Sequence, residues 1–493
     1  MTVAHSIRRV AIIGAGPSGL ASAKFLLAEK CFDQIDIFEQ RLSVGGAWNP
    51  TPEKAAQSTP VPQTKPPQRD ADLSHGPNFM SPLYDRLETN IPKELMRYSD
   101  KPFPADAPLF PKHQTVKKYL EEYAEDVKDL IHFGTNVFHV MLKDLQLGTW
   151  DIATMNVYTG GVKVRTYDAV VVASGHFNVP YLPDIAGISA WNQAYLGSIS
   201  HSKFYNTPEP FRGKKVVVVG NSASGLDIGA QINEVCEGKL LVSRRSESYL
   251  GTAPNTDKII CPEIVEFLPP SRHDRAIRFA DGRIEEHVDA VVFCTGYFYS
   301  YEFFPALQPP VETHGWRTEN VYQQLFYIPY PTLVFPVLSQ RVIPFPMAEN
   351  QAAVFARVWS GRLSLPSRAA MEEWEQAEVA RKGDGRAFHL LPFPQDADYL
   401  NFLYDWATRA APRHELENNG NGKLGIYWTE RERWMRARFP DIRRAFVQKG
   451  EQRSKIKSIE ELGFDFGEWK REQEQLHADA MHTDGHPVAL PFR

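Results

Sequence analysis

A chain of 493 residues, 43% of them hydrophobic, is long enough for two or three separately packed units, since single cores rarely exceed roughly 250 to 300 residues. Its 55 basic and 60 acidic residues leave a net charge of −5. This overall charge does not favour binding to nucleic acid or to an anionic membrane, and a small-molecule partner fits better. The four cysteines form no C-x-x-C pair, which argues against a disulfide scaffold, a zinc site or a redox dithiol. We expect four buried apolar thiols.

The N-terminal sequence MTVAHSIRRV runs directly into a strand-like AIIG, without an apolar h-region or a cleavage site. No stretch approaches the roughly 20 apolar residues that a membrane-spanning helix needs. We therefore expect a soluble, cytoplasmic protein without a transmembrane segment, and leave peripheral attachment to a membrane open.

Residues 8–39 read as a strand, a helix from Pro17 and a second strand, a βαβ unit that predicts a parallel sheet. The turn G-A-G-P-S-G lies between strand and helix. Gly14 permits the tight turn, Gly16 lets the backbone approach a pyrophosphate, and Gly19 lets helix and strand pack closely. Glu39 ends the next strand 20 residues after Gly19 and is expected to accept hydrogen bonds from a ribose. Pro17, Ser18 and Gln40 complete this predicted site.

An acid at position 39 would repel a 2′-phosphate, so the first site suits the adenosine of FAD or NAD rather than that of NADP. Residues 51–77 follow, rich in proline and polar side chains, and we expect a surface loop there. Apolar residues at helical spacing then predict an amphipathic helix from Val116 to Ile131.

We call the G-A-G-P-S-G turn the first cradle. A second glycine-rich turn of this kind, the second cradle, follows the apolar strand KKVVVVG at 214–220 and precedes a helix from about Ser224 to Val235. It departs from the strict fingerprint in having a serine at the middle glycine position, where a small side chain still allows a phosphate to approach. Its predicted ligands are Gly220, Ser222, Ala223, Ser224 and Gly225. The next strand ends in Ser243, Arg244 and Arg245 instead of an acid. Arg244 is expected to hold a 2′-phosphate, which indicates NADPH; the alternative is two solvated surface arginines.

These elements predict an α/β fold with two Rossmann-like dinucleotide-binding domains, the second inserted into the first. The FAD domain is expected to comprise residues 1–178 and 297–493, and the NADPH domain residues 179–296. Beyond Trp359 the chain is charged and Trp-rich, with helical patches such as AAMEEWEQAEVARK, and we expect an appended C-terminal helical layer. The alternatives for this layer and the Pro-rich loop are control of substrate access and a homodimer interface.

Several segments, in order, resemble the flavin-containing monooxygenases, which are class B flavoprotein monooxygenases, here of the soluble fungal or yeast-like type. G-G-A-W contains Gly45, Gly46 and Trp48. L-G-S-I-S-H-S-K-F-Y at 196–205 matches the family fingerprint at Gly197, His201 and Tyr205, with Leu196 in place of the usual Phe, a change expected to weaken packing more than chemistry. The other segments are Y-D-R-L-E-T-N-I-P-K-E-L-M at 84–96, V-V-V-A-S-G-H at 170–176, V-F-C-T-G-Y at 292–297 and P-F-P-M-A-E-N-Q at 344–351.

The resemblance implies that NADPH reduces FAD, that O₂ adds at flavin C4a, and that the hydroperoxide oxygenates an amine, thiol or thioether. It implies Asn90 as the catalytic residue that orients the hydroperoxide and the nicotinamide, His201 as a residue that couples the domains, and further cofactor contacts at Gly46, Trp48, Thr89, Val137 and Gln351. Three alternatives remain. A Baeyer-Villiger monooxygenase is disfavoured by Tyr205, and a disulfide oxidoreductase would need a dithiol that this chain lacks. The third is a nucleotide-binding or scaffold protein without catalytic activity. His113, His132 and His139 are too widely spaced for a zinc triad, so no metal is expected.

Overall fold

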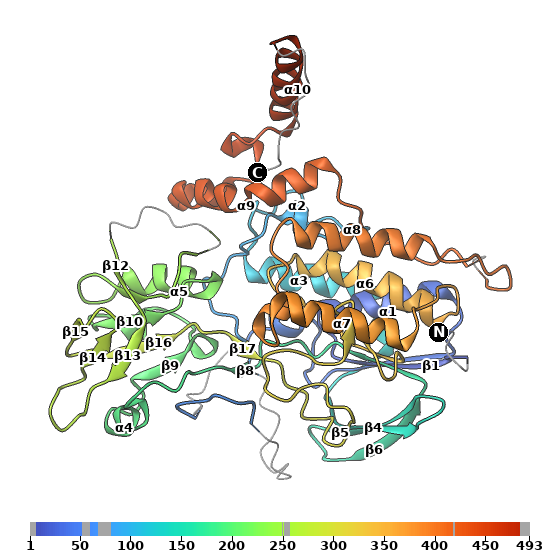
Figure 1. Cartoon of the computed structure of the whole chain (residues 1–493), viewed down its shortest axis with the longest axis horizontal. Helices are drawn as coiled ribbons and strands as arrows, with labels where there is room; N and C mark the ends of the chain where they lie inside the picture. Colours follow the sequence, from blue (N-terminus) through green and yellow to red (C-terminus); the bar gives the residue numbers. More distant parts are fainter. Residues whose placement is uncertain are drawn as a thin grey trace.

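The computed structural model describes residues 6–51, 60–67, 80–248, 250, 257–417 and 420–483. Two sheets with parallel strands organise the chain, and the strands of the smaller sheet all come from a sequence interval that interrupts the larger one (Figure 1). The predicted α/β fold with one dinucleotide-binding domain inserted into another is therefore confirmed. None of the helices in the described ranges is long and apolar enough to cross a membrane.

The larger domain is built on a seven-stranded sheet whose strands come from both ends of the chain. Its central strands are parallel, and three short strands from beyond the inserted domain, each antiparallel to the next, complete one edge. In spatial order the strands are β18 (Val321–Tyr322), β19 (Phe326–Tyr327), β20 (Leu333–Val334), β7 (Ala169–Val172), β1 (Arg9–Ile13), β2 (Gln34–Phe38) and β3 (Ile131–His132). Because β20 pairs with β7, the chain returns to the same sheet after the insertion.

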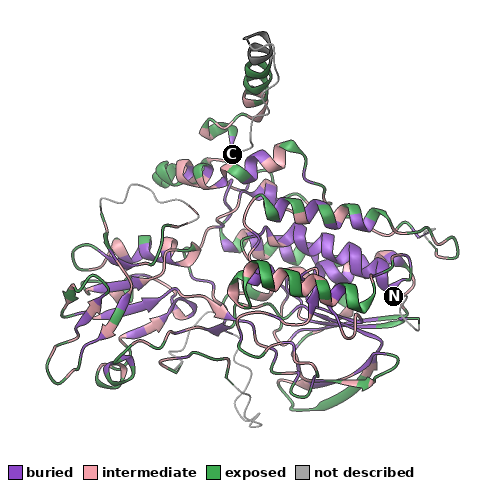
Figure 2. Ribbon diagram, viewed as in Figure 1, coloured by how far each residue is buried: buried purple, intermediate pink, exposed green. Residues whose placement is uncertain are grey.

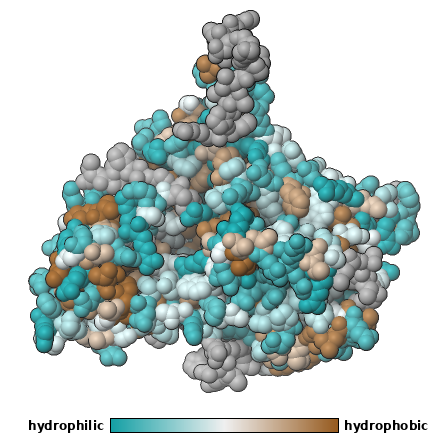
Figure 3. Space-filling model, viewed as in Figure 1, coloured by the Kyte–Doolittle hydropathy of each residue, from teal (hydrophilic) through white to brown (hydrophobic). Residues whose placement is uncertain are grey.

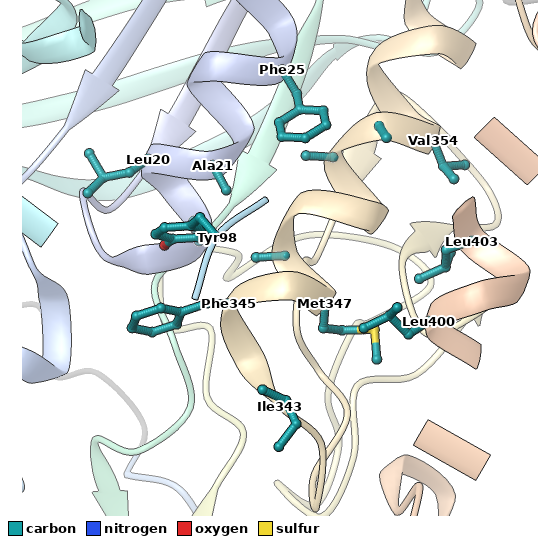
Figure 4. Packing of buried hydrophobic residues seen from close by; sticks show 14 of the residues in the cluster. Leu20, Ala21, Phe25, Tyr98, Ile343, Phe345, Met347, Val354, Leu400 and Leu403 are labelled. Carbon is teal, nitrogen blue, oxygen red and sulfur yellow. The ribbon is translucent and has the colours of Figure 1, made fainter. Parts of the chain in front are cut away.

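Helices α1 (Pro17–Glu29) and α6 (Pro344–Trp359) pack together, and α8 (Gln395–Thr408) lies against α6. After Pro344 every residue of α6 is buried, as expected for a helix that is covered on all sides (Figure 2). Figure 4 shows the contact: Leu20 and Phe25 of α1 and Leu400 of α8 lie on opposite sides of α6. Burying side chains of this size contributes roughly 1.5–3 kcal/mol each. This core fixes the helix that begins at the first cradle.

The smaller domain contains an all-parallel five-stranded sheet and helices α4 (Ile188–Ala194) and α5 (Ala223–Asn233). In spatial order its strands are β12 (Ile259–Cys261), β11 (Leu241–Ser243), β10 (Val216–Val219), β16 (Ala290–Phe293) and β9 (Ile199–His201). A small antiparallel sheet joins it, formed by β13 (Ile264–Phe267), β14 (Ile277–Phe279) and β15 (Ile284–Glu285). Figure 3 shows apolar atoms gathered over this end of the domain, where the exposed apolar residues are Ile259, Ile260, Val265 and Ile284.

The two crossings between the domains lie side by side. β8 (Val179–Pro180) pairs antiparallel with β17 (Tyr297–Phe298), in a two-stranded sheet close to the predicted boundaries at 178/179 and 296/297. A further antiparallel sheet of the larger domain contains β4 (Thr135–Asp144), β5 (Thr149–Asn156) and β6 (Val162–Tyr167). The exact domain boundaries stay a prediction.

Helices also cover the upper part of the larger domain in Figure 1. The last helix, α10 (Phe466–Thr483), projects from the body, while α9 (Glu430–Gln448) contacts the short α2 (Lys93–Met96). The remaining helix of this C-terminal layer is α7 (Arg368–Lys382), which coincides with the patch predicted from its sequence.

Three expectations need correction. The helix predicted over residues 116–131 is shorter: α3 spans His113–Tyr123, and a 3₁₀ helix (Glu125–Leu130) follows it. Ile131 already belongs to β3, where pairing with β2 overrides helical spacing.

In the Pro-rich segment, Gln63 is buried and its side chain donates to the carbonyl of Pro180, so residues 60–67 are anchored. Residues 52–59 and 68–77 lie outside the described residues. Of the four free cysteines, Cys261 and Cys294 are buried, whereas Cys31 and Cys236 are half-buried.

Candidate functional site

The first cradle is the turn between β1 and α1, and its geometry requires glycine at two positions. Gly14 has φ +103°, and a Cβ there would lie 2.6 Å from the carbonyl oxygen of Ala173. A Cβ on Gly19 would lie 1.9 Å from the carbonyl oxygen of Gly14. Helix α1 then begins at Pro17, and no side chain of the described residues caps it. Its N-terminal amide groups are therefore available to an anion.

The second cradle, between β10 and α5, repeats this geometry. Gly220 has φ +108°, and a Cβ there would lie 2.7 Å from the carbonyl oxygen of Cys294. A Cβ on Gly225 would lie 2.0 Å from the carbonyl oxygen of Gly220. Ser222 precedes α5 at φ −82° and makes no capping bond with its side chain. Any residue can adopt that conformation, so a serine in place of the middle glycine costs no backbone strain. Ala223 and Ser224 form the first turn of α5.

Glu39, directly after β2, is buried beside the first cradle. Its two carboxylate oxygens accept hydrogen bonds of 2.9 Å from the backbone N–H groups of Ala15 and Arg41. Each oxygen keeps lone-pair capacity for a further donor, such as a ribose hydroxyl. The Arg41 guanidinium in turn donates 2.6 Å to the carbonyl of Gly46, which orders the 3₁₀ helix Gly46–Trp48 against the cradle. Sequence reasoning did not single out Arg41.

Three further predicted cofactor residues have different surroundings. Gln40 is half-buried next to Glu39. Trp48 packs edge-on against Phe345 of α6, at 6.4 Å between ring centroids. Val137 on β4 is buried in the same cluster as Ile13 and Phe38, the last residues of β1 and β2. Trp48 and Val137 therefore lie close to elements that form the first cradle.

Gln351 is fully buried on α6, and its amide is engaged within the protein. The side-chain oxygen accepts 2.7 Å from the N–H of Val337, and the nitrogen donates 3.2 Å to the hydroxyl of Tyr399. Val337 has a left-handed backbone, with φ +59°. Gln351 therefore fixes an irregular turn, a positioning task that its place in the sequence did not indicate.

Arg244 and Arg245 follow β11, where the sequence predicted a 2′-phosphate site. They line a hollow of about 410 Å³ with Ser246 and Glu247. The carboxylate of Glu247 lies 2.7 Å from Nη1 of Arg244, and Glu263 lies 2.6 Å from Nε of Arg245. Both guanidinium groups are paired, but only the side chain of Arg244, 18% exposed, is shielded from solvent, whereas that of Arg245 is 80% exposed.

A second hollow, of about 310 Å³, lies between the two domains. Asn221, Ser222 and residues 246–248 line it from the smaller domain, and Arg341 lines it from the larger one. Arg341 has a left-handed backbone (φ +63°), and its carbonyl accepts 2.9 Å from Nη2 of Arg436 on α9. No local sequence pattern marks Arg341, because only the fold brings it opposite Ser222.

Asn90 lies on residues 84–93, a short segment that connects the cores of the two domains and that we call the Asn90 segment. Leu87 packs against the core of the smaller domain, and Ile91 packs against that of the larger one. Thr89 is buried, and its N–H donates 2.9 Å to the carbonyl of Pro111, while its hydroxyl donates 3.0 Å to that of Ile91. The side chain of Asn90 is half-buried, and within the described part of the chain it makes no hydrogen bond. Its amide is therefore available to a ligand.

The fingerprint at 196–205 lies beside the second crossing between the domains, where the ring of His201 packs edge-on against that of Tyr297 on β17. His201 is buried; its Nε2 lies 3.1 Å from the carbonyl of Gly296, and its Nδ1 accepts 3.1 Å from the N–H of Lys203. Burial lowers the pKa of His201 to about 3, so the ring is neutral at physiological pH and cannot act there as an acid. Leu196 is 83% exposed and contributes little to any core.

Comparison with known proteins decides the family. The family model described as flavin-binding monooxygenase-like matches residues 73–255 and 259–413, and an NAD(P)-binding Rossmann-like domain matches residues 12–86. The thiol-specific monooxygenase of Saccharomyces cerevisiae is 33% identical over 387 residues, covering 74% of this chain and 80% of that protein. The chain belongs to the flavin-containing monooxygenase family.

Two further relatives of this flavin-containing monooxygenase agree. Flavin-containing monooxygenase FMO GS-OX3 of Arabidopsis thaliana is 33% identical over 422 residues, covering 80% of this chain and 84% of that protein. The structure of S-allyl-L-cysteine S-oxygenase from Allium sativum superposes with a TM-score of 0.73 at 28% identity, covering 92% of this chain and 96% of that one.

Membership of the flavin-containing monooxygenases implies FAD and NADPH as cofactors. The structure contains two cradles that fit two dinucleotides: in each, a Cβ on the first or last glycine would collide with backbone, and the helix that follows has no side-chain cap. The number and type of sites therefore agree with the cofactors of the family.

Proposed function

We propose that this chain is an NADPH- and O₂-dependent monooxygenase that transfers one oxygen atom to a soft nucleophilic sulfur or nitrogen. For a thioether, NADPH, a proton, O₂ and the sulfide give NADP⁺, water and the sulfoxide. The observation that carries the proposal is the pair of matching cradles, one in each domain, with the Asn90 segment connecting the two cores. FAD, when bound, accepts the electrons of NADPH and activates O₂.

We assign FAD to the first cradle and NADPH to the second. Glu39, with capacity left on both carboxylate oxygens, suits a ribose with free hydroxyls and would repel a 2′-phosphate. The residues proposed to hold FAD are Gly14, Gly16, Pro17, Ser18, Gly19, Glu39, Gln40, Gly46, Trp48, Thr89 and Val137, with Gln351 positioning the turn beside them.

Arg244 supports the choice of NADPH over NADH. Its guanidinium lines the larger hollow after β11, where a charge-assisted fork can hold a 2′-phosphate. Glu247 holds that fork before the cofactor arrives. The residues proposed to hold NADPH are Gly220, Ser222, Ala223, Ser224, Gly225 and Arg244.

Asn90 is the proposed catalytic residue. A neutral amide donates a hydrogen bond without delivering an acidic proton, which suits a site that must keep activated oxygen from being lost as peroxide. The buried neutral ring of His201 likewise releases no proton at physiological pH. The protein's task in this account is to orient the reactants and to exclude water.

Two observations support a heteroatom substrate. The relatives named above include a thiol-specific monooxygenase and an S-allyl-L-cysteine S-oxygenase, which favours sulfur. The fingerprint also ends in Tyr205, whereas Baeyer-Villiger monooxygenases, the alternative, usually have Trp at that place. The substrate class is therefore tested by competition.

In that test, the flavin-loaded protein receives NADPH, air and equal amounts of a thioether, a thiol, a tertiary amine and a cyclic ketone, and mass spectrometry identifies the products. Oxygenated sulfur or nitrogen compounds are expected. A lactone as the main product would favour the Baeyer-Villiger reaction, and hydrogen peroxide without any oxygenated product would contradict the proposal.

A variant separates the role of Asn90 from that of the cofactors. Asn90→Asp keeps the size of the side chain but replaces the NH₂ donor, so NADPH consumption should continue while most of it ends as hydrogen peroxide. Asn136→Asp, on β4, is the control and should leave the product ratio unchanged. Equal ratios in the two variants would remove Asn90 from the mechanism.

A further inference from the structure

Two arginines from the C-terminal layer reach the residue that precedes Thr89 and Asn90. Nη2 of Arg443, on α9, lies 3.5 Å from the carboxylate of Glu88, and Nε of Arg453, on the 3₁₀ helix Gly450–Lys455, lies 3.2 Å from it. The side chain of Glu88 is only 11% exposed. Glu88 and these arginines are 355 and 365 residues apart in the sequence.

This contact differs from an ordinary surface ion pair. Exposed pairs of opposite charge contribute little, because water screens them and long side chains lose freedom. Here the Arg443 guanidinium lies over the rings of Phe110 and Phe446, at 4.9 and 5.5 Å, and burial lowers its pKa. Removing a partner from a mostly buried pair leaves an uncompensated charge, so the position of Glu88 depends on Arg443 and Arg453.

The backbone around Asn90 is tied to the same layer by a second route. Glu88 pairs with Lys112, and the N–H of Lys93 donates 2.9 Å to the carbonyl of Leu109. The N–H of Leu109 donates 2.8 Å to the carbonyl of Ile456, which follows the 3₁₀ helix that carries Arg453. The Asn90 segment is therefore held by backbone bonds on one side and by the arginine pair on the other.

We propose that Arg443 and Arg453 are positioning residues: through Glu88 they fix the Asn90 segment, and so determine how much of the NADPH oxidised ends in oxygenated product. The inference rests on the proposed function, in which Asn90 orients the reactants. Without the two arginines, Asn90 shifts and NADPH, a proton and O₂ give NADP⁺ and hydrogen peroxide instead. The C-terminal layer thus supports the reactive site without contacting a reactant.

Hydrogen–deuterium exchange of the flavin-loaded protein tests the first half of this proposal. In Arg443→Gln and in Arg453→Gln, peptides covering residues 84–93 and 109–113 are expected to exchange on the order of tenfold faster than in the natural chain, because a charged hydrogen bond is lost from a local unit. Arg444→Gln is the matched control: Arg444 pairs with Asp441 on the exposed side of the same helix, 2.9 Å away. Unchanged exchange in both test variants would overturn the proposal.

The ratio of hydrogen peroxide to oxygenated product, measured in the same variants, tests the second half. It should rise several-fold in Arg443→Gln and Arg453→Gln, stay constant in Arg444→Gln, and return toward its original value in Arg443→Lys, which restores the charge. Arg453 is partly exposed, so Arg453→Gln should fold even if Arg443→Gln does not. Faster exchange together with an unchanged ratio of peroxide to product would mean that the two arginines stabilise the Asn90 segment without affecting the reaction, which would overturn the second half of the proposal. Failure of the natural chain to oxygenate any substrate would instead count against the proposed function, while the exchange experiment would still show whether Arg443 and Arg453 fix the Asn90 segment.

Discussion

The hydroxyl of Tyr84 donates a hydrogen bond to the carboxylate of Asp227, which joins the Asn90 segment to helix α5 of the smaller domain. Asp227 also accepts 3.1 Å from Gln231, and Gln231 accepts 3.0 Å from the hydroxyl of Tyr205 in the fingerprint. The helix that begins at the second cradle, the fingerprint and the Asn90 segment therefore share one network of hydrogen bonds.

Tyr84→Phe tests that network. The ring keeps its edge-on contact with Tyr205 at 5.4 Å, but the half-buried Asp227 loses its hydroxyl donor. Loss of a hydrogen bond to a charged group should lower the free energy of unfolding by about 1.5–3 kcal/mol and raise the share of peroxide. Chemical unfolding and product analysis measure both. Tyr195→Phe is the control, because the hydroxyl of Tyr195 makes two long hydrogen bonds to backbone groups: it lies 3.4 Å from the carbonyl of His273 and accepts 3.3 Å from the N–H of Arg275. This variant should lower the free energy of unfolding less and leave the share of peroxide unchanged; similar losses in the two variants would refute the assignment.

Alanine substitutions at the last glycine of each cradle test which cofactor binds where. Gly225→Ala places a Cβ 2.0 Å from the carbonyl of Gly220, so the protein should keep its flavin absorbance but lose NADP⁺ binding in a spectroscopic titration. Gly19→Ala should instead lose FAD. The strain should cost about 1–3 kcal/mol or more at each site. Gly229→Ala on α5 is the control, because its Cβ would only touch Leu240 at 3.4 Å. Loss of FAD in Gly225→Ala would reverse the assignment.

Arg244→Ala tests the preference for NADPH. Losing a charge-assisted contact to the 2′-phosphate should raise KM for NADPH by roughly tenfold to a hundredfold, with KM for NADH nearly constant. Steady-state kinetics with both nucleotides measure this. Arg278→Ala, which removes a pair with Glu266 elsewhere in the smaller domain, should affect neither nucleotide. A parallel rise for NADPH and NADH would mean that Arg244 does not contact the 2′-phosphate.

The buried ring of His201 predicts a specific dependence of stability on pH. Its pKa falls from 6.5 in the unfolded chain to about 3 in the folded one, because burial disfavours the charged ring. Between these values only the unfolded state binds the proton, so stability is lost as pH falls below 6.5, by about 1.4 kcal/mol per pH unit. Thermal unfolding from pH 7 to pH 4 should therefore show a flatter curve for His201→Gln. Parallel curves would show that His201 titrates normally in the folded protein.

Local sequence predicts the two cradles well, because strand, turn and helix are contiguous and the backbone around Gly14 and Gly220 admits only glycine. The sequence does not predict the contacts that hold the site. Arg341 reaches the second cradle from the other domain, and Arg443 reaches Glu88 across 355 residues, so neither leaves a local pattern. Gln351 lies on α6, but its amide holds Val337, a partner that only tertiary packing reveals. The exposure of Leu196, an apolar residue in the fingerprint, is likewise not evident from the local sequence.

Oxygen-isotope transfer shows whether the oxygen atom in the product comes from O₂. The flavin-loaded protein is mixed with NADPH, a simple thioether and oxygen-18 gas, and mass spectrometry follows the label while NADPH consumption is recorded. We expect one labelled oxygen atom in each sulfoxide molecule and one NADPH consumed for each. Sulfoxide with unlabelled oxygen, or complete conversion of the NADPH and oxygen to hydrogen peroxide with thioether, amine and ketone alike, would contradict the proposed function.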